Sequence, residues 1–509
     1  MPHYPTLYQI NTRVHLTGLA RALGRQVTLD DLSERMLDRY AQQGFEWLYL
    51  LGVWPTGPRV RQLALQHPNL LAEYHHLLPD FSEADVCGSC FAIAGYHIAD
   101  AMGGGGAMLR LRERLHARGM RLMLDFIPNH VGLDHRWVWQ HPEYFVAGDE
   151  EKLRRAPQNY IRIANHEGDD LILAHGRDPY FDGWSDTLQL NYANPDLQAA
   201  MTEELLHISG LCDGLRCDMA MLVRPEVFQR TWGLVAQPFW PRAIQAVRQV
   251  HPQFTFMAEV YWNQELTLVA QGFDFCYDKG YYDVLLGGEA AAVSEYILER
   301  SDYHANLARF LENHDERRAA VVFKSDWRSG NEQYKAAAVL TYTLPGLRFF
   351  HEGQLEGWRE KLPMQLCRGP KEITNVDLQA FYASLLAVLA DSRLREGFWQ
   401  YHLATTMGAR PGASTTAIAW SWGPASGTYH HIHERLLCVV NYSPDPCRFV
   451  IQLGRDGLHG KSWRFSDRLS SFFVEQDGGR IGGQGLQLDM PAWGRYIFAI
   501  TQLSAFDQA

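Results

Sequence analysis

The first 395 residues alternate short apolar runs with longer stretches of helical spacing, and this alternation limits the fold more than any other feature. Strands that alternate with helices pair in parallel and are covered by those helices, so eight such units predict a closed (β/α)₈ barrel. An open doubly wound sheet is the structural alternative. The predicted strands are Leu7–Asn11, Trp47–Leu51, Leu122–Phe126, Gly214–Cys217, Phe254–Ala258, Phe273–Phe275, Phe310–Leu311 and Leu347–Phe350.

Two regions break the alternation. Residues 131–184 are rich in His, Asp, Asn and Gly without clean periodicity, and a connection of this length is typical of a functional loop or a small inserted domain. Residues 396–509 contain short β-type runs separated by Gly, Pro, Asp and His, which predicts an antiparallel sandwich. The barrel is therefore expected to comprise residues 1–130 and 185–395.

Charge and hydropathy exclude several classes of function. The net charge is −11 and no dense basic run occurs, which argues against binding to nucleic acid or to an anionic membrane. No apolar stretch reaches 18 residues, so no membrane span is expected. The segment MPHYPTLYQINTRV lacks a basic region followed by an apolar one, so we expect no signal peptide and a cytoplasmic location.

The chain has eight cysteines, several of them in apolar runs where a small buried thiol is common. The single Cys87-x-x-Cys90 pair has no second pair and no nearby His to complete a metal site. Reduced thiols fit this pattern best, and a structural or redox role for the pair is the alternative.

Polar side chains follow four of the predicted strands. The segments are Asp125–His130 (DFIPNH), Gly214–Asp218 (GLRCD), Met257–Trp262 (MAEVYW) and Phe310–Asp315 (FLENHD). The active site of a (β/α)₈ barrel is built at the carboxyl ends of the strands, so these segments should converge. The side chains expected at that barrel mouth are Asp218, Glu259, Asp315, Arg216, His130 and His314.

Paired carboxyl groups of this kind suit the cleavage of a glycosidic bond, in which one attacks the anomeric carbon and the other protonates the leaving oxygen. Arg216 lies two residues before Asp218 and thus on the same side of a strand, where it would keep that carboxylate ionised. Glu259 must instead hold its proton near neutral pH, which burial and neighbouring carboxylates promote. Asp125 lies earlier on its strand and is expected to support Arg216 or the barrel rim.

The four segments resemble, in the right order, the signature regions of the α-amylase family, glycoside hydrolase family 13. The matching residues are Asp125, Asn129, His130, Gly214, Arg216, Asp218, Glu259, Asn313, His314 and Asp315. The segment Gly88–Tyr96 is similar to the one that follows the second strand in that family, and Thr343–Gly346 is similar to its approach to the eighth strand. The resemblance extends over essentially the whole chain.

The resemblance implies a role for each matching residue. Asp218 would form a covalent glycosyl-enzyme intermediate with retention of configuration, Glu259 would act as acid and then as base, and Asp315 would stabilise the distorted transition state. Retention implies carboxyl groups roughly 5–5.5 Å apart on Asp218 and Glu259. The implied sugar-binding residues are Tyr96, His130, Arg216 and His314. Tyr261 and Trp262 are expected either to form an aromatic wall on the acceptor side or to pack in the core.

The sequence departs from the family after the nucleophile position. Many α-amylases have Lys and His there, which serve an acceptor subsite and a calcium site, whereas this chain has Met221 and Leu222. Apolar side chains cannot ligate calcium, so the usual calcium site is in doubt and Asn129 is the one oxygen ligand candidate left. No cofactor is required. Arg317 and Arg318 either bind an acceptor or phosphate, or form a solvated rim paired with Glu316.

Three functions remain open. The first is hydrolysis of α-glucosidic bonds in malto-oligosaccharides or related short α-glucans. The second is transfer, in which an acceptor sugar or phosphate intercepts the same intermediate, because only the attacking species differs. The third is a non-catalytic scaffold such as the amylase-like heavy subunits of amino-acid transporters. The expected partner is an oligosaccharide or α-glucan, and the oligomeric state stays open.

Overall fold

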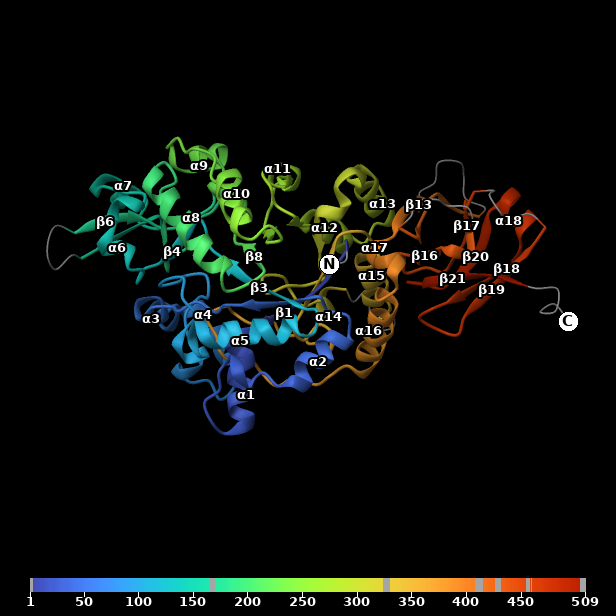
Figure 1. Cartoon of the computed structure of the whole chain (residues 1–509), viewed down its shortest axis with the longest axis horizontal. Coiled ribbons are helices and arrows are strands. Elements are labelled where there is room, and N and C mark those ends of the chain that lie inside the picture. Colours follow the sequence, from blue (N-terminus) through green and yellow to red (C-terminus); the bar gives the residue numbers. More distant parts are fainter. Residues whose placement is uncertain are drawn as a thin grey trace.

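Eight parallel strands close into a barrel in the order β1-β12-β11-β10-β9-β8-β3-β2, which confirms the predicted (β/α)₈ architecture (Figure 1). The computed structural model describes residues 3–164, 170–323, 330–407, 415–425, 432–454, 458 and 460–503. The barrel strands are β1 (Thr6–Asn11), β2 (Trp47–Leu51), β3 (Arg121–Phe126), β8 (Gly214–Cys217), β9 (Thr255–Ala258), β10 (Phe275–Tyr277), β11 (Leu307–Arg309) and β12 (Leu347–His351).

The sixth barrel strand begins later than the sequence predicts. Gly272 has a φ of 113° and turns the chain, so β10 starts at Phe275 and extends to Tyr277. Phe273, predicted to begin the strand, packs instead against Trp240 with ring centroids 4.8 Å apart. The predicted range Phe273–Phe275 is therefore wrong by two residues.

The seventh barrel strand begins earlier than predicted. β11 ends at Arg309, and the predicted range Phe310–Leu311 lies just beyond it. Arg309 forms an ion pair with Asp278 at 3.0 Å inside the barrel wall. Because a strand with a charged residue is not an apolar run, hydropathy did not indicate β11. Phe310 packs on Phe349 of β12, with ring centroids 6.0 Å apart, and begins the loop that leads to the site.

Helices follow the strands and surround the barrel. Helix α5 (Gly104–His116) leads into β3, and the left-handed Gly119 lies just past its end. The other long helices are α1 (Thr12–Leu23), α2 (Glu34–Gln42), α3 (Pro58–Gln66), α4 (Pro68–Leu77), α8 (Pro195–Ser209), α9 (Pro225–Trp232), α10 (Trp240–Val250), α12 (Lys279–Gly287), α13 (Ala290–Glu299), α15 (Glu332–Tyr342) and α16 (Val376–Leu389). The shorter helices are α6 (Trp137–Gln140), α7 (Glu150–Arg155), α11 (Glu265–Ala270), α14 (Ala319–Val322), α17 (Ser392–Glu396) and α18 (Gly478–Gln484).

An insertion between β3 and β8 extends from the barrel on the left of Figure 1. Its two ends pair as antiparallel strands, β4 (His130–Gly132) and β7 (Thr187–Gln189), and its outer part contains the hairpin β5 (Tyr160–Ile163) and β6 (Leu171–Ala174). Pairing of β4 with β7 fixes the base of the insertion at the carboxyl end of β3.

The C-terminal part is a sandwich of two antiparallel sheets, at the right of Figure 1, as predicted. One sheet has the order β13-β15-β16-β21-β18-β19 and the other β14-β17-β20. The bounds are β13 (Phe398–His402), β14 (Ala404–Thr406), β15 (Ala417–Gly423), β16 (Leu436–Asn441), β17 (Cys447–Ile451), β18 (Ser462–Asp467), β19 (Phe473–Asp477), β20 (Leu486–Met490) and β21 (Arg495–Leu503).

The sandwich shares a hydrophobic core with the barrel. Trp420 and Trp422 on β15 are fully buried, and their indole N–H groups both donate to the carbonyl oxygen of Thr343, at 3.0 and 2.7 Å. Tyr442 donates to the carbonyl oxygen of Leu285 at 2.9 Å. These buried side chains belong to the same apolar cluster as the barrel wall, so the two units pack as one body.

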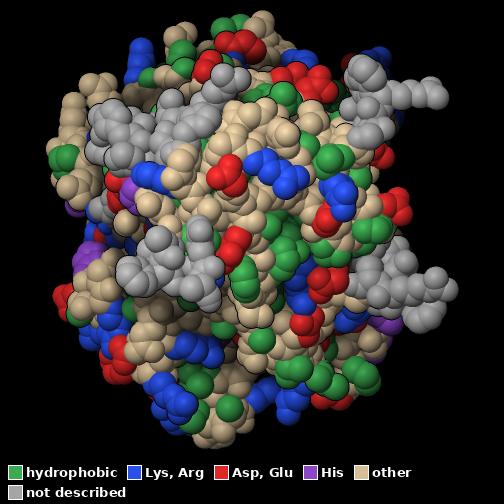
Figure 2. Space-filling view, turned by 90° about the vertical axis from the view of Figure 1, so that its right-hand side faces the viewer, with side chains coloured by type: hydrophobic (Ala, Val, Ile, Leu, Met, Phe, Trp, Pro, Cys, Tyr) green, Lys and Arg blue, Asp and Glu red, His purple; other side chains and the backbone are tan. Residues whose placement is uncertain are grey.

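The face at the sandwich end carries acidic, basic and apolar side chains interspersed (Figure 2). Opposite charges pair across neighbouring strands there, as Arg464 and Glu475 do at 2.6 Å between β18 and β19. No helix among the described residues is long and apolar enough to cross a membrane.

Candidate active site

The register of the parallel strands sets Asp218 beside Glu259. Cys217 of β8 pairs with Ala258 of β9, and each strand then continues directly into a carboxyl-bearing residue. The backbone N–H of Glu259 donates to the carbonyl oxygen of Cys217 at 2.9 Å, which extends the ladder by one step. Two predicted site residues therefore lie on adjacent strand ends because of strand pairing alone.

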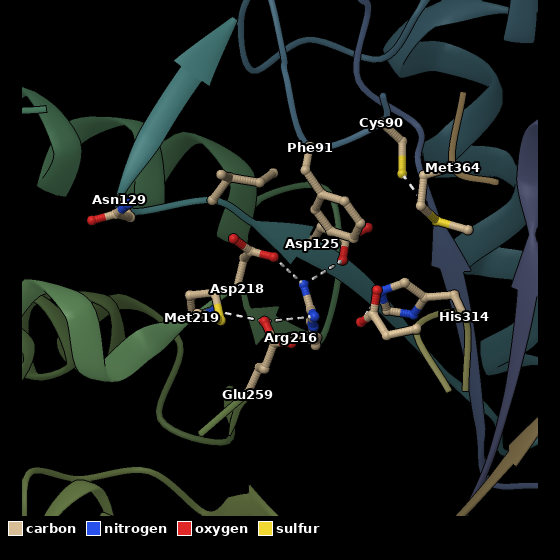
Figure 3. Close-up of polar contacts among 12 residues, drawn as sticks. Cys90, Phe91, Asp125, Asn129, Arg216, Asp218, Met219, Glu259, His314 and Met364 are labelled. Atoms are coloured by element: carbon tan, nitrogen blue, oxygen red, sulfur yellow. Dashed lines mark hydrogen bonds and ion pairs between the residues drawn. The ribbon is translucent and has the colours of Figure 1, made fainter. Parts of the chain in front are cut away.

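Arg216 connects the two carboxylates. Its Nη1 donates to Asp218 Oδ1 at 2.7 Å, and its Nη2 forms an ion pair with Glu259 Oε2 at 2.8 Å (Figure 3). The guanidinium is completely buried, and both carboxyl side chains are almost so. One rigid, planar cation thus fixes the orientation of both carboxyl groups.

Asp125 supports this arginine from the neighbouring strand β3, as the sequence predicts. Its Oδ1 lies 3.8 Å from Nη1 of Arg216, and β3 and β8 pair in register at these two residues. Asp125 also accepts hydrogen bonds from the hydroxyl of Tyr49 and from the backbone N–H of Gly52. With its lone pairs engaged by the barrel wall, Asp125 positions Arg216.

Glu259 has the environment expected of a proton donor. Its Oε2 accepts a hydrogen bond from the backbone N–H of Met219 at 2.7 Å, and its Oε1 accepts one from the hydroxyl of Tyr261 at 2.8 Å. Burial, with the charges of Asp218 and Asp315, raises the pKa of Glu259 to about 7 against the opposing effect of Arg216. A carboxyl group with such a pKa can donate a proton near neutral pH.

Met219 takes a strained backbone conformation to reach Glu259. Its φ of 42° lies in the left-handed region, which a residue with a side chain rarely adopts. Strain of this type persists where the surrounding structure over-determines it, and it clusters at functional sites. Here it turns a backbone N–H toward the carboxyl oxygen that Arg216 also contacts.

Burial and the neighbouring Arg216 have opposite effects on the pKa of Asp218. Burial raises the pKa of Asp218 above its ordinary value, and the charges of Asp315 and Asp125 add to the effect, while Arg216 opposes it. The hydrogen bond from Arg216 favours the ionised form. A carboxylate in this position can serve as a nucleophile once it has lost its proton.

Asp315 lies on the loop after β11 and is more open than the other two carboxyl groups. Its side chain is 42% exposed, and its Oδ2 lies 3.0 Å from Nε2 of His314. Asn313 Oδ1 accepts hydrogen bonds from the backbone N–H groups of Asp315 and Glu316, which is the local turn that Asn favours. Asn313 thus fixes the turn on which Asp315 lies.

The three carboxyl groups influence one another electrostatically. The charge of Asp315 raises the pKa of both Asp218 and Glu259, so all three lie within electrostatic reach at one barrel mouth. Desolvation opposes ionisation of Asp315, but the charges of His314, Arg216 and Lys361 outweigh it and hold the pKa of Asp315 below its ordinary value. Near neutral pH, where Glu259 titrates, Asp315 is therefore ionised.

His314 is fixed on both sides. Gln9 Nε2 lies 3.1 Å from its Nδ1, and Asp315 Oδ2 lies 3.0 Å from its Nε2. Its ring stacks on Phe91 at a centroid distance of 5.3 Å, and the same Phe91 ring lies 5.1 Å from the guanidinium carbon of Arg216. Phe91 therefore lies between His314 and Arg216, beside the charged residues (Figure 3).

The remaining predicted sugar-binding residues line the barrel end at different depths. Tyr96 is buried in the barrel wall, where its hydroxyl donates to the carbonyl oxygen and accepts from the N–H of Ile127, at 2.8 and 2.9 Å. His130 packs against Trp184 at 5.0 Å, and burial lowers its pKa to about 3, so its ring is neutral. Sugar contacts by Tyr96 and His130 stay predictions.

The predicted aromatic wall has further members from the insertion. Trp262 has a left-handed φ of 62° and meets the ring of Tyr180 edge-on at 5.0 Å. The guanidinium of Arg230 lies 5.0 Å from the Tyr180 ring and 5.9 Å from the Trp262 ring. Tyr180 and its neighbour Phe181 are 59% and 72% exposed, so these aromatic faces are open to a ligand.

The side-chain oxygen of Asn129 already accepts a hydrogen bond. Its Oδ1 accepts a hydrogen bond from Gln189 Nε2 at 3.0 Å, across the β4–β7 junction. Within the described ranges, no three His, Cys, Asp or Glu side chains converge in a way that could hold a metal ion. Among the described residues, calcium binding at Asn129 therefore has no support from a cluster of such side chains.

Arg318 differs from the expectation of a solvated rim. It is 4% exposed and pairs with Glu312 at 2.7 Å, while the predicted partner Glu316 ion-pairs with Lys279 at 3.4 Å. The Glu312–Arg318 pair closes the turn beneath the Asn313–Asp315 loop. Arg318 thus supports the loop, and only Arg317 of the pair is exposed.

Several residues of the site were not predicted from the sequence. Phe91, Gln9, Tyr277 and Lys361 come from four different segments, and no local pattern distinguishes them from core or surface residues. Tyr277 lies beneath Arg216, with its ring centroid 5.7 Å from the guanidinium carbon. Tyr277 is the exception, because the predicted strand Phe273–Phe275 would end on Tyr277 if it were shifted by two residues.

Comparison with known proteins supports the resemblance. A family model described as "Alpha amylase, catalytic domain" matches residues 90–270, the part that contains Asp125, Asp218 and Glu259. The chain is similar to "Alpha-amylase MalA" of Haloarcula japonica, with 26% identity over 272 residues, 52% of this chain and 36% of that protein. It is also similar to "Intracellular maltogenic amylase" of Bacillus subtilis, with 25% identity over 315 residues, 58% of this chain and 48% of that protein.

The fold is similar to a solved structure over nearly its full length. The maltogenic α-amylase AmyB of Thermotoga neapolitana superimposes with a TM-score of 0.66 and 18% identity, covering 99% of both chains. In sequence, the chain spans half or less of the length of the two curated relatives. The match of residues 90–270 to the catalytic-domain model and the similarity to the two relatives support an enzyme of the α-amylase family.

Proposed function

We propose that this chain is a retaining α-glycosidase that acts on α-glucosidic bonds of malto-oligosaccharides or related short α-glucans. The observation that carries the proposal is the single buried guanidinium of Arg216 between the carboxyl groups of Asp218 and Glu259. It supports a pair of adjacent carboxyl groups with opposite protonation states, which is what two-step displacement at an anomeric carbon requires. The substrate class follows from the family and from the names of the relatives, two of them an α-amylase and a maltogenic amylase.

In the first step, Asp218 attacks the anomeric carbon while Glu259 gives its proton to the leaving oxygen. In the second, Glu259 takes a proton from water, which attacks the same carbon and releases Asp218. The pKa of Glu259, about 7, supports the exchange of roles near neutral pH. Asp315, ionised and 42% exposed, would accept hydrogen bonds from sugar hydroxyls as positive charge develops on the ring.

A second candidate, transfer to a sugar acceptor, is favoured by the aromatic residues beyond Glu259. Trp262 and Tyr180 meet edge-on, Arg230 lies over the Tyr180 ring, and Tyr180 is largely exposed. Flat aromatic faces bind the apolar face of a pyranose, so an acceptor held there would compete with water for the glycosyl intermediate. We propose these residues as the acceptor wall and a cytoplasmic location for the protein, as the name of the intracellular Bacillus relative suggests.

A product profile tests the proposal. The protein is incubated with maltose, maltotriose, isomaltose, trehalose, sucrose and starch, with and without phosphate, and the products are followed by NMR. Release of the α-anomer from malto-oligosaccharides is expected, with longer oligosaccharides as additional products if transfer occurs. Initial release of the β-anomer would contradict retention, and no turnover of any of these glucosides would contradict the glycosidase assignment.

The catalytic variants provide the matched controls for this profile. Asp218→Asn and Glu259→Gln are expected to lower turnover by roughly 10²–10⁴-fold, the usual contribution of such groups, while far-ultraviolet circular dichroism stays unchanged. Glu316→Gln changes a half-buried carboxyl group beside Asp315 that pairs with Lys279, outside the proposed chemistry. It should keep most of the activity.

A further inference from the structure

Two cysteines from distant parts of the chain meet at the rim of the barrel mouth. Val86 and Leu366 form an antiparallel bridge between the segment after β2 and the segment after β12. On either side of the bridge, the N–H of Cys87 donates to the carbonyl oxygen of Gln365, and the N–H of Cys367 donates to that of Asp85, both at 2.8 Å. The bridge therefore holds Cys87 and Cys367 on neighbouring chain segments.

Each of the two thiols contacts the backbone of the opposite segment. The Sγ of Cys87 lies 3.3 Å from the carbonyl oxygen of Gln365, and the Sγ of Cys367 lies 3.3 Å from that of Asp85; both residues are half-buried, free thiols. Further along the same two segments, Cys90 Sγ lies 3.9 Å from Met364 Sδ (Figure 3). This packing keeps the segments together, so the distance between Cys87 and Cys367 is set by several contacts.

Arg13 forms a hydrogen bond with Cys87. Its guanidinium is 8% exposed, and it donates to the carbonyl oxygens of Gly52, Gly88 and Trp54 and to Cys87 Sγ, the latter at 3.2 Å. A buried arginine stays charged and needs a compensating negative group. Of these four contacts, only Cys87 can supply one, by ionising to the thiolate.

We propose that Cys87 and Cys367 form a site of reversible thiol oxidation, which reacts with small-molecule disulfides such as oxidised glutathione to give a disulfide between the two segments. The inference is independent of the proposed glycosidase function, because its readout is a covalent bond within the protein.

The reaction proceeds in two exchanges. The Cys87 thiolate attacks one sulfur of glutathione disulfide, the S–S bond breaks, and one glutathione thiolate leaves. Cys367 then loses its proton and attacks the Cys87 sulfur of the mixed disulfide, which releases the second glutathione. Two electrons pass from the cysteine pair to glutathione disulfide, and an excess of reduced glutathione reverses both steps.

The charge state of the pair supports this order of attack. The hydrogen bond from Cys367, and after it Arg13, lower the pKa of Cys87 to about 6, against the opposing effect of burial. The same contact raises the pKa of Cys367, which therefore stays a thiol until the mixed disulfide has formed. The thiolate is the reactive form, so Cys87 is the attacking residue and Cys367 the resolving one.

Peptide mapping of the full chain tests the site. The reduced protein is exposed to glutathione disulfide at pH 7, quenched with an alkylating reagent, and digested without reduction. A linked Cys87–Cys367 peptide is expected before Cys447, a half-buried cysteine of the sandwich, is modified. Failure of the linked peptide to form, or modification of Cys447 at the same rate as Cys87, would overturn the proposal.

Two variants separate the roles of the pair. In Cys367→Ser, glutathione should remain on Cys87 as a stable mixed disulfide, whereas Cys87→Ser should take up none at Cys367. Cys447→Ser is the matched control and should behave as the wild type. A Cys367→Ser protein whose Cys87 does not react with glutathione disulfide would contradict the proposal.

The pH dependence of alkylation tests the effect of Arg13 without mutating a buried residue. The rate at which iodoacetamide modifies Cys87 should rise to half its maximum near pH 6 and be constant above about pH 7. A rate that still rises steeply above about pH 8, as for an ordinary thiol, would contradict a thiolate at this position.

Discussion

At the scale of single residues, Arg216 organises the site. It contacts Asp218, Glu259 and Asp125 at 2.7, 2.8 and 3.8 Å while completely buried. A buried cation surrounded by three carboxyl groups cannot leave all of them fully ionised at the same pH, because each added negative charge raises the pKa of the others. Glu259 is the group whose pKa is raised to about 7.

The pH dependence of activity follows from these directions. Glu259 must be protonated to act as acid, so kcat/KM should fall as pH rises through about 7. Asp218 must be ionised to attack, so activity should also fall at acidic pH, at a value above the ordinary pKa of Asp because burial raises it. A bell-shaped profile is expected, and activity that is constant from pH 6 to 9 would contradict the assignment of Glu259.

Tyr261 provides a sharper residue-scale prediction. Its hydroxyl donates to Glu259 Oε1 at 2.8 Å, and a donor to a carboxylate stabilises the ionised form. Tyr261→Phe should therefore raise the pKa of Glu259 and move the alkaline limb of the profile to higher pH. Trp262→Phe, one residue on, should leave that limb in place even where it changes KM, and an unmoved limb in Tyr261→Phe would contradict the hydrogen bond.

At the scale of elements, strand register explains what the sequence could predict of the site. Asp218 and Glu259 directly follow β8 and β9, so recognising the strands was enough to bring them together. The first residue of β8 is glycine, Gly214, because a Cβ at this position would lie only 2.8 Å from the carbonyl oxygen of Thr255 on β9. Residues on loops far from any strand end, such as Phe91 and Lys361, depend on tertiary packing and had no local signal.

The errors in the predicted fold concern the bounds of two strands, β10 and β11. β10 and β11 are three-residue strands, too short to fix their bounds by hydropathy, and β11 ends on the ion-paired Arg309, which interrupts its apolar run. The boundaries of the insertion and of the sandwich at single-residue precision stay predictions. The antiparallel sheets of both units lie where the sequence places a loop-rich insertion and a β-rich C-terminal part.

Helix α1 is attached to β12 by a titratable contact. His15 Nδ1 lies 2.6 Å from Glu352 Oε1, and the other oxygen of Glu352 accepts from the N–H of Asn11 at the start of the helix. Burial alone would lower the pKa of His15, but the charge of Glu352 outweighs it and raises that pKa above its ordinary value. The pair therefore stabilises the fold fully below about pH 6.5.

This contact predicts a pH-dependent stability. As pH rises through the raised pKa of His15, the stabilisation is lost, and His15→Gln should remove this pH dependence at a cost of roughly 1–2 kcal/mol at pH 6. Urea unfolding at pH 6 and pH 8 measures both effects. His141→Gln, whose ion pair with Glu143 is exposed, is the matched control and should change stability by less than about 0.5 kcal/mol.

At the scale of the whole molecule, the barrel and sandwich share one apolar core. Trp420 and Trp422 of β15 lie in the same buried cluster as the barrel wall, and both indole groups donate to Thr343. A separate cluster fills the interior of the sandwich itself. The sandwich therefore covers an apolar face of the barrel, and the catalytic part should not fold stably without it.

Trp420→Ala tests this coupling. Loss of a fully buried indole should lower the free energy of unfolding by about 3–5 kcal/mol and shift one cooperative transition in calorimetry. Phe473→Ala, at a side chain that is 54% exposed on β19, should leave the transition nearly unchanged. Two separate transitions, with only the smaller one shifted, would show that barrel and sandwich unfold independently.

The covalent intermediate on Asp218 is the central claim, and mass spectrometry of a trapped intermediate tests it most directly. The protein is incubated with 5-fluoro-α-glucosyl fluoride, which forms the intermediate faster than it is hydrolysed, and the digest is searched for a glycosylated peptide. We expect one fluoroglucosyl group on the peptide that contains Asp218, and none in Asp218→Asn. Attachment to another residue, or turnover of the reagent with inversion and without any adduct, would contradict the account.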